Sequence, residues 1–352
     1  MSRFIMVILT NADSIAIKIW RAEQNPETVK DVVECLVDPQ LELKHGIGNA
    51  FVSINISVLD SGRYLAQGFN VQVLAWAYKL GISTVRKIIY ETYDALWVEL
   101  GSIYVSPPNV TELRKIADDF FIKTGMPNCV GAIDGKHINM FRPRKSGSLY
   151  FNYKKRFSIT LLAACDANYV FTYVDVGSFG SQSDGGIFSR TAFGKKILDG
   201  TLEVPPDRPL PHTSINFPYY FVADNAFPLK KNLMRPFPGH FLSPDKTAFN
   251  KALSKARVHI ENAFGILANR WRVLHTNIHA NPENADKVVL ATIVLHNFLM
   301  LHRDNSYITN AHRDHDDQNS LQSISNTVSN RSSTSAFELR NILKDFIYPQ
   351  LN

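Results

Sequence analysis

Two short stretches decide the fold, Val130-Gly-Ala-Ile-Asp-Gly-Lys-His137 and Tyr220-Phe-Val-Ala-Asp-Asn-Ala-Phe227. In each stretch a run of apolar residues is closed by an aspartate, Asp134 in the first and Asp224 in the second. A continuous apolar run is typical of a central strand that is buried on both faces of a sheet. An acid that closes such a strand is expected to be paired or bound to a metal ion, because an isolated buried charge is costly.

A third acid, Glu261, lies in Ala256-Arg-Val-His-Ile-Glu-Asn-Ala-Phe-Gly265, within a helix expected from about Phe249 to Leu274. Glu261 falls at the margin of the apolar stripe of this helix, where a carboxylate can reach over the edge of a sheet. Three convergent carboxylates that hold two Mg²⁺ ions are a common protein solution for in-line attack at a phosphodiester. The order strand aspartate, strand aspartate, helix glutamate therefore predicts a nuclease or transposase. The expected stripe consists of Leu253, Ala256, Ile260, Phe264, Leu267 and Trp271.

Each acid also has a purely structural interpretation, because Asp-Gly and Asp-Asn are turn dipeptides. Asp184 and His137 are secondary candidates: Asp184 opens a helix after a polar loop and would usually be an N-cap, whereas His137 could orient a phosphate or make a structural hydrogen bond. A phosphatase that uses Asp134 as its nucleophile is a more distant possibility, because the second aspartate expected two residues later is Lys136.

The moderately positive charge of the chain is compatible with a polyanionic partner, although it is not sufficient to predict one. The 352 residues carry a formal net charge of +6, and the basic residues gather in two stretches that flank the candidate acids, so that phosphate would be drawn to the site. Lys136, Lys154, Lys155 and Arg257 are the DNA-binding candidates here. The stretches contain Lys136, Arg142, Arg144, Lys145, Lys154, Lys155 and Arg156, and then Lys230, Lys231, Arg235, Lys246, Lys251, Lys255 and Arg257.

Cysteine use and hydropathy indicate an intracellular protein that is not in a membrane. The three cysteines, Cys35, Cys129 and Cys165, show no zinc-ligand spacing. The apolar run Phe4–Leu9 is too short to cross a bilayer.

Four segments are expected along the chain. Residues 1–60 are unassigned. Residues 61–106 are helical: a helix Val71–Lys79, a turn at residues 80–82, and a second helix that Ser83 caps and that runs to about Leu100. This pattern is typical of a DNA-binding helix-turn-helix whose Arg86 and Lys87 face outward, and an ordinary helical hairpin is the alternative.

The pattern of apolar and polar residues in 110–302 predicts a mixed α/β domain. Its expected strands are Cys129–Phe141, Phe157–Ala164 and Val170–Val176, and a helix is expected near Ile187–Leu198. Residues 303–352 read as a mostly disordered tail by composition, with a short amphipathic helix at Ala336–Ile347.

Several motifs occur in an order that resembles the PIF/Harbinger class of DDE transposases and the domesticated Harbinger-derived nucleases. The resemblance extends from about Arg63 to His302. Its motifs are Arg63-Tyr-Leu-Ala66, Gly81-Ile-Ser-Thr-Val-Arg-Lys-Ile88, Gly131-Ala-Ile-Asp-Gly-Lys-His137, Asn152-Tyr-Lys154, Asp175-Val-Gly177, Ser183-Asp-Gly-Gly-Ile-Phe188, Phe221-Val-Ala-Asp-Asn-Ala-Phe-Pro-Leu229, Arg257 with Glu261-Asn-Ala-Phe-Gly265, and Leu295-His-Asn-Phe298.

The resemblance implies an RNase H-like fold with Asp134, Asp224 and Glu261 as the metal-binding triad. It implies two Mg²⁺ or Mn²⁺ ions per site, DNA as the substrate, and a nuclear location that does not exclude the cytoplasm. It also implies a separately encoded Myb/SANT-like partner that supplies much of the DNA recognition; a dimer is one option for the oligomeric state. The competing hypothesis is a catalytically silent DNA-binding or scaffold protein that retains the fold.

Overall fold

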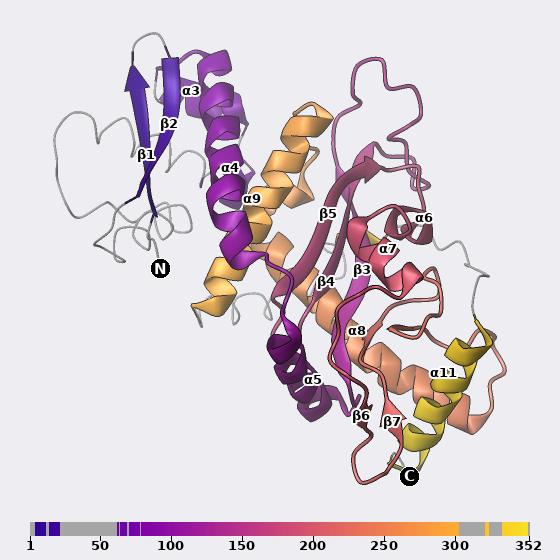
Figure 1. Cartoon of the computed structure of the whole chain (residues 1–352). Helices are drawn as coiled ribbons and strands as arrows, with labels where there is room; N and C mark the ends of the chain where they lie inside the picture. Colours follow the sequence, from indigo (N-terminus) through magenta and orange to yellow (C-terminus); the bar gives the residue numbers. More distant parts are fainter. Residues whose placement is uncertain are drawn as a thin grey trace. The chain divides into compact units, whose positions relative to one another are not determined.

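The computed structural model describes residues 4–11, 14–21, 62, 64–68, 70–77, 79–302, 321–323 and 333–350, the first two ranges by their backbone alone. The chain forms two compact units (Figure 1). The first comprises Met1–Val105, Asn139–Pro143 and Leu267–Asn319, and the second comprises Ser106–Ile138, Arg144–Ile266 and Ser320–Asn352. The candidate acids all belong to the second unit.

A mixed sheet forms the centre of the second unit, in the order β5-β4-β3-β8-β9. The parallel pairs are β3–β8 and β8–β9, whereas β4–β5 is antiparallel and β10 pairs antiparallel with β3 at Lys136 and His137. This arrangement, flanked by helices, confirms the expected RNase H-like α/β fold. The strands are β3 (Cys129–Asn139), β4 (Ser158–Cys165), β5 (Phe171–Phe179), β8 (Tyr220–Val222), β9 (Leu233–Met234) and β10 (Gln322–Ser323).

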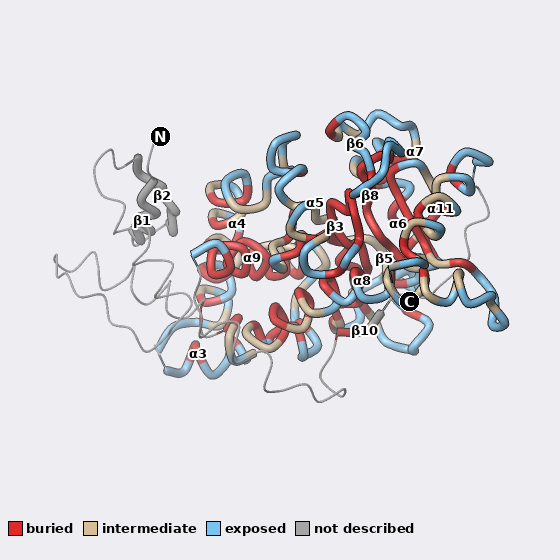
Figure 2. Tube along the Cα trace, turned by 90° about the horizontal axis from the view of Figure 1, so that it is seen from below, coloured by how far each residue is buried: buried red, intermediate tan, exposed pale blue. Residues whose placement is uncertain are grey.

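Strand β3 is the most deeply buried element of the sheet, as its apolar run predicts. Every residue of β3 except the last is buried, and the tube in Figure 2 shows the strand within the interior. Gly131 is required at one point of close approach, because a Cβ there would lie 2.7 Å from the Phe221 ring of β8 and 3.0 Å from the Cys165 carbonyl oxygen. The pairing of β3 with β8 therefore depends on a residue without a side chain.

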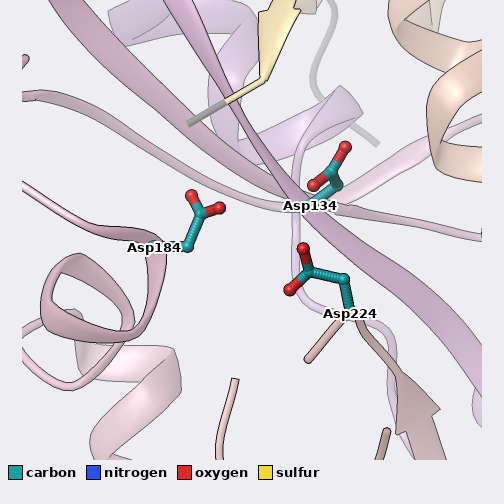
Figure 3. Close-up of side chains that lie close together, drawn as sticks. All are labelled: Asp134, Asp184 and Asp224. Atoms are coloured by element: carbon teal, nitrogen blue, oxygen red, sulfur yellow. The ribbon is translucent and has the colours of Figure 1, made fainter. Parts of the chain in front are cut away.

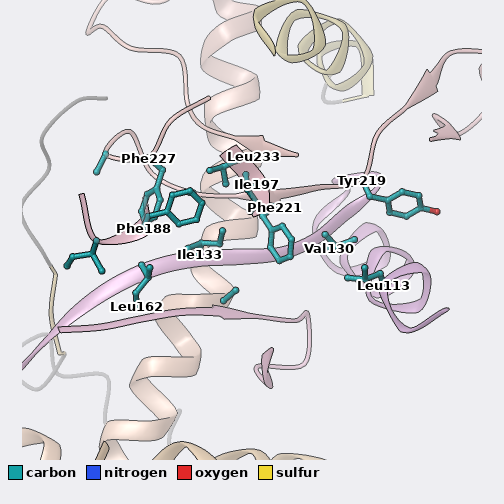
Figure 4. Packing of buried hydrophobic residues seen from close by; sticks show 14 of the residues in the cluster. Leu113, Val130, Ile133, Leu162, Phe188, Ile197, Tyr219, Phe221, Phe227 and Leu233 are labelled. Atoms are coloured by element: carbon teal, nitrogen blue, oxygen red, sulfur yellow. The ribbon is translucent and has the colours of Figure 1, made fainter. Parts of the chain in front are cut away.

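One apolar cluster covers one face of the sheet. It joins the sheet to residues of α5 (Val110–Thr124), α6 (Asp184–Phe188) and α7 (Ala192–Asp199) (Figure 4). Helix α8 (Pro244–Arg270) lies across the other face (Figure 1), with Phe264 5.6 Å from Phe171 of β5 between ring centroids. The predicted stripe of α8 is buried throughout, including Trp271 just beyond its end.

A C-terminal helix, α11 (Thr334–Ile347), docks on the second unit and matches the amphipathic helix expected at Ala336–Ile347. Arg340 donates to the Pro236 carbonyl oxygen at 3.0 Å and its guanidinium lies 4.0 Å from the Phe237 ring centroid. Leu343 is fully buried. Most of the tail predicted to be disordered, including 303–320, lies outside the described residues.

The first unit contains the antiparallel hairpin β1 (Phe4–Asn11) and β2 (Ser14–Arg21), then α3 (Val71–Ala77), α4 (Ile82–Tyr104) and α9 (Pro282–Leu301). Asn297 of α9 donates to the Tyr104 carbonyl oxygen of α4 at 2.7 Å. By length and composition α9 could cross a membrane, but 72% of its apolar window is buried inside the structure. Burial on this scale is typical of a core helix.

The structure corrects three expected boundaries. Gly81, not Ser83, is the N-cap of α4, because the helix begins at Ile82, two residues earlier than a cap at Ser83 implies. The helix expected at Ile187–Leu198 is two helices, since Thr191 accepts a hydrogen bond from the Gly194 backbone and starts α7 as a new helix. Helix α8 begins at Pro244 and ends at Arg270, after which Arg272–His275 forms a 3₁₀ turn.

Candidate metal centre

Three carboxylates meet at one end of the central strands. Asp134 comes from β3, Asp224 follows β8, and Asp184 is the first residue of α6. One carboxylate oxygen from each lies within 4.8 Å of the other two. Figure 3 shows the three side chains facing a common space from three separate elements. The two strand acids are therefore brought together as predicted, with Asp184 as their observed neighbour.

Asp134 is held by the sheet and by one buried cation. Its residue is 3% exposed, and its Oδ2 lies 2.9 Å from Nζ of Lys136, two residues later on the same strand. Lys136 is itself 7% exposed, and its ammonium lies 5.7 Å from the Phe264 ring centroid of α8. The structure thus places this DNA-binding candidate inside the carboxylate cluster, where it offsets part of the negative charge.

Asp224 is fixed by the turn that follows β8. Its Oδ1 accepts a hydrogen bond from the Ala226 backbone at 2.9 Å, and Arg235 braces the same turn by donating to the Phe227 carbonyl oxygen at 3.0 Å. Burial raises the pKa of Asp224, the Ala226 hydrogen bond and the Arg257 charge oppose that rise, and the Asp134 charge adds to it. The Asp224 side chain points into the space that it shares with Asp134 and Asp184 (Figure 3).

Asp184 is 1% exposed, and its Oδ1 is buried with no hydrogen-bond partner. Ser183 occupies the N-cap position, so Asp184 is not the cap that its sequence position suggests. Gly185 allows α6 to approach the Asp224 turn, because a Cβ there would lie 2.6 Å from the Ala226 carbonyl oxygen. Burial, with Asp134 and Asp224 beside it, raises the pKa of Asp184 to about 8.

Glu261, the third member of the predicted triad, lies on α8 outside this cluster. Its side chain is 48% exposed, and its Oε1 lies 3.6 Å from a terminal nitrogen of Arg257, one turn earlier. Arg257 is more buried, with its side chain 19% exposed, and its Nε has no hydrogen-bond partner. Its positive charge opposes the rise in the pKa of both Asp184 and Asp224. Arg257 thus interacts electrostatically with Asp184 and Asp224 as well as with Glu261.

His137 belongs to a buried hydrogen-bond chain beside the cluster. Its Nδ1 lies 2.9 Å from Ser158 Oγ, which also accepts from the Asn152 side chain at 3.0 Å. Burial, with a smaller contribution from the Lys154 charge, lowers the pKa of His137 to about 4. The imidazole is neutral at pH 7, which agrees with the structural hydrogen bond that the sequence suggests.

The remaining basic candidates are on the surface. Lys154 and Lys155 are exposed in the turn between β3 and β4. Arg86 and Lys87 are exposed near the start of α4, in the first unit, where Lys87 pairs with Glu91 at 3.8 Å.

The aspartate cluster fits a hard divalent cation. Carboxylate oxygens are the ligands that Mg²⁺ and Mn²⁺ prefer, and three of them from separate elements converge here. A buried carboxylate oxygen without a donor, as at Asp184, is uncommon unless a cation completes its environment. Lys136 supplies one positive charge to three acids, so further positive charge would stabilise the cluster.

A comparison with family models and a comparison with individual proteins point to the same kind of relative. Residues 133–297 match the family described as DDE superfamily endonuclease. "Protein ALP1-like" of Arabidopsis thaliana is 28% identical over 303 residues, which are 85% of this chain and 72% of that protein. "Putative nuclease HARBI1" of Xenopus laevis is 26% identical over 231 residues, which are 63% of this chain. The matched region spans 61% of HARBI1, less than two thirds of its length. No solved structure matches the chain.

Residues 133–297 contain Asp134, Asp184, Asp224 and Glu261, so all the candidate acids lie in the region that matches the DDE superfamily endonucleases. The family match and the relatives support the resemblance of the chain to the PIF/Harbinger-type DDE transposases and their domesticated derivatives.

Replacing Asp184 by Asn should remove a pH dependence of stability. The pKa of the Asp184 carboxyl is about 8 in the folded protein, against an ordinary value of 3.8. Between these two pH values the folded state therefore binds the carboxyl proton more tightly than the unfolded state does. The free energy of unfolding therefore falls as pH rises from about 4 to about 8, by at most about 1.4 kcal/mol per pH unit for one group. Denaturant unfolding with EDTA across that range should show a shallower decline in Asp184→Asn. The exposed Asp199→Asn should keep the wild-type slope, and an unchanged slope in Asp184→Asn would refute the assignment.

Replacing Gly185 by Ala should push α6 away from the Asp224 turn. The new Cβ would meet a backbone carbonyl at 2.6 Å, which cannot rotate aside. Gly186→Ala is a matched control, because its nearest neighbour is the Ser183 hydroxyl oxygen at 3.2 Å, the end of a small side chain. We expect the thermal stabilisation caused by Mn²⁺ to be lost in Gly185→Ala and kept in Gly186→Ala, as measured by melting with and without the ion. Equal stabilisation in both variants would contradict this packing account.

Proposed function

We propose that this protein is a Mg²⁺-dependent DNA endonuclease of transposase origin, which acts on phosphodiester bonds by hydrolysis or strand transfer. The observation that carries the proposal is the convergence of Asp134, Asp184 and Asp224 at the ends of the central strands. The family match over residues 133–297 supports DNA as the substrate and divalent ions as cofactors. The name of the HARBI1 relative also describes a nuclease.

The residues of the chain have distinct parts in this proposal. Asp134 and Asp224 would hold the ions in common, and Asp184 would add a ligand oxygen. Glu261, the triad member implied by the family resemblance, would join by turning from Arg257. Two divalent ions, when bound, supply activation of the attacking water and charge neutralisation at the leaving oxygen. Mn²⁺ would serve in place of Mg²⁺.

Lys136 and Arg257 would hold the cluster together before the ions arrive. Their charges act on the same acids, Lys136 through its 2.9 Å contact with Asp134 and Arg257 through its effect on Asp184 and Asp224. Both cations would then be available to attract a phosphate toward the cluster. We further propose a nuclear location and a Myb/SANT-like DNA-binding partner, which rest on the family resemblance alone.

The alternative is a DNA-binding scaffold that has kept the fold and lost catalysis. The exposed position of Glu261 and its contact with Arg257 favour this alternative, because they leave two of the three predicted triad members in the cluster. The presence of all three acids favours the enzyme. A plasmid-nicking assay with Mg²⁺ or Mn²⁺ therefore separates the two functions.

Replacing Asp224 by Asn should lower metal-dependent nicking by orders of magnitude, because a neutral amide is a poor ligand for a hard cation. Folding should be preserved or slightly improved, since one of three crowded acids is removed. The measurement is nicking of supercoiled plasmid DNA, with thermal melting of each variant as the control for folding. Equal nicking by the wild type and Asp224→Asn would refute the nuclease. If neither cuts DNA even with a DNA-binding partner present, the scaffold function is supported.

Two further variants decide which residue completes the site. Asp184→Asn should reduce nicking if the observed cluster is the working site, and Glu261→Gln should reduce it if Glu261 joins the ions as proposed. Asp199→Asn, an exposed acid on α7, is the control for loss of one carboxylate. If Glu261→Gln keeps full nicking activity and Asp184→Asn loses it, the three aspartates are all the acidic residues that the site uses.

Replacing both Arg86 and Lys87 by Ala should test α4 as a DNA-binding helix. Each phosphate contact contributes about 0.9 to the dependence of log affinity on log salt concentration. We expect binding to weaken for every DNA sequence and the salt slope to fall by about one to two units. The measurement is binding of duplex DNA across a salt series. An unchanged slope would assign α3 and α4 to a plain helical hairpin.

A further inference from the structure

The turn between β3 and β4 combines exposed aromatic and basic side chains. Its large exposed side chains are Leu149 at 51%, Phe151 at 40% and Tyr153 at 55% exposure. Lys154, Lys155 and Arg156 follow directly and are also exposed. No aspartate or glutamate occurs between residues 135 and 165 of the sequence. This surface, Leu149–Arg156, is called the aromatic-basic turn below.

The aromatic-basic turn is held in a defined shape by a buried amide. Asn152, which is 2% exposed, accepts hydrogen bonds at its Oδ1 from the Lys154 and Arg156 backbones, each at 3.0 Å. Lys155 adopts a left-handed conformation with φ of 60°, which is costly for a residue with a side chain. The backbone of the turn is therefore held in a defined conformation from Asn152 to Arg156.

The same amide connects the turn to strand β3. Asn152 donates to Ser158 Oγ, which lies 2.9 Å from His137 Nδ1. His137 follows Lys136, the residue that contacts Asp134, and the Tyr153 ring centroid lies 6.0 Å from that of His137. A ligand on the exposed face of Tyr153 would thus lie beside the part of strand β3 that carries His137, three residues beyond Asp134.

The chemistry of this surface indicates which nucleic acid it suits. Cations alone are sufficient to bind the phosphates of duplex DNA, whose bases are stacked on one another. Exposed aromatic rings gain energy only from bases that are unstacked and free to lie on them. Lys154 Nζ lies 5.7 Å from the Tyr153 ring centroid, so a stacking face and a phosphate-binding charge are adjacent.

We infer that the aromatic-basic turn binds an unpaired strand of DNA, with bases stacked on Tyr153 and Phe151 and phosphates held by Lys154, Lys155 and Arg156. The inference rests on the proposed function and deepens it, because it specifies DNA with separated strands as the substrate.

The test is binding of single-stranded oligothymidine and of duplex DNA, measured by fluorescence anisotropy in EDTA so that no cleavage occurs. Tyr153→Ala should weaken oligothymidine binding about tenfold, within the range for loss of one base stack, and should change duplex binding by less than about twofold. Tyr153→Phe keeps the ring and should bind oligothymidine like the wild type. Phe241→Ala is the matched control, because it removes a fully exposed ring elsewhere in the second unit.

A charge variant checks the phosphate half of the inference. Lys154→Ala with Lys155→Ala should reduce the salt slope for oligothymidine, whereas Tyr153→Ala should leave that slope unchanged because it removes no charge. Equal weakening of single-stranded and duplex binding by Tyr153→Ala would overturn the inference, as would no weakening of either. If Tyr153→Ala weakens neither single-stranded nor duplex binding, the turn is instead a surface for a protein partner.

The outcome is separable from that of the proposed function. If the wild type nicks DNA and Tyr153→Ala binds oligothymidine normally, only the inference about the turn fails. If no nicking is found but Tyr153→Ala loses oligothymidine binding selectively, the turn is confirmed as a single-strand site on a protein without nuclease activity.

Discussion

The parallel pairing of β3 with β8 is the constraint on which the candidate metal centre depends. The last residue pair between β3 and β8 is Ala132 with Val222. Asp134 follows Ala132 by two residues, and Asp224 follows Val222 by two residues. Because parallel strands end at the same edge of a sheet, equal spacing beyond the last pair brings the two carboxylates together. Gly131 permits this pairing by leaving room for the Phe221 ring.

Other parts of the second unit adjust the charge and shape of that edge. Helix α6 delivers Asp184 by packing against the Asp224 turn, and α8 brings Arg257 close enough to act on both acids. The chain Asn152, Ser158, His137 fixes the aromatic-basic turn to β3. Strand β10 pairs with β3 at Lys136 and His137. Residues 322 and 323 thus lie against the strand that carries Asp134.

The sequence predicted the strand acids well because their surroundings are local. An apolar run of five residues or so before an acid is visible without any knowledge of the fold, and β3 and β8 are buried as that pattern requires. Asp184 is a weaker candidate in the sequence, because it opens a helix after a polar loop, where an N-cap is the usual interpretation. The available signal was Gly185 itself, since a glycine early in a helix suggests close approach of another backbone.

The sequence by itself determined the mixed α/β class, the burial of the α8 stripe and the position of Asp134 and Asp224 at the ends of buried strands, because apolar periodicity and strand ends are properties of neighbouring residues. The RNase H-like fold was implied by the family resemblance. Only the tertiary structure decided the third carboxylate of the cluster. Asp184 and Glu261 both lie on helices, and the side chain that reaches the strand acids depends on how each helix packs on the sheet. Gly185 admits α6, because a Cβ there would lie 2.6 Å from the Ala226 carbonyl oxygen, whereas the side chain of Glu261 is 48% exposed and lies 3.6 Å from Arg257.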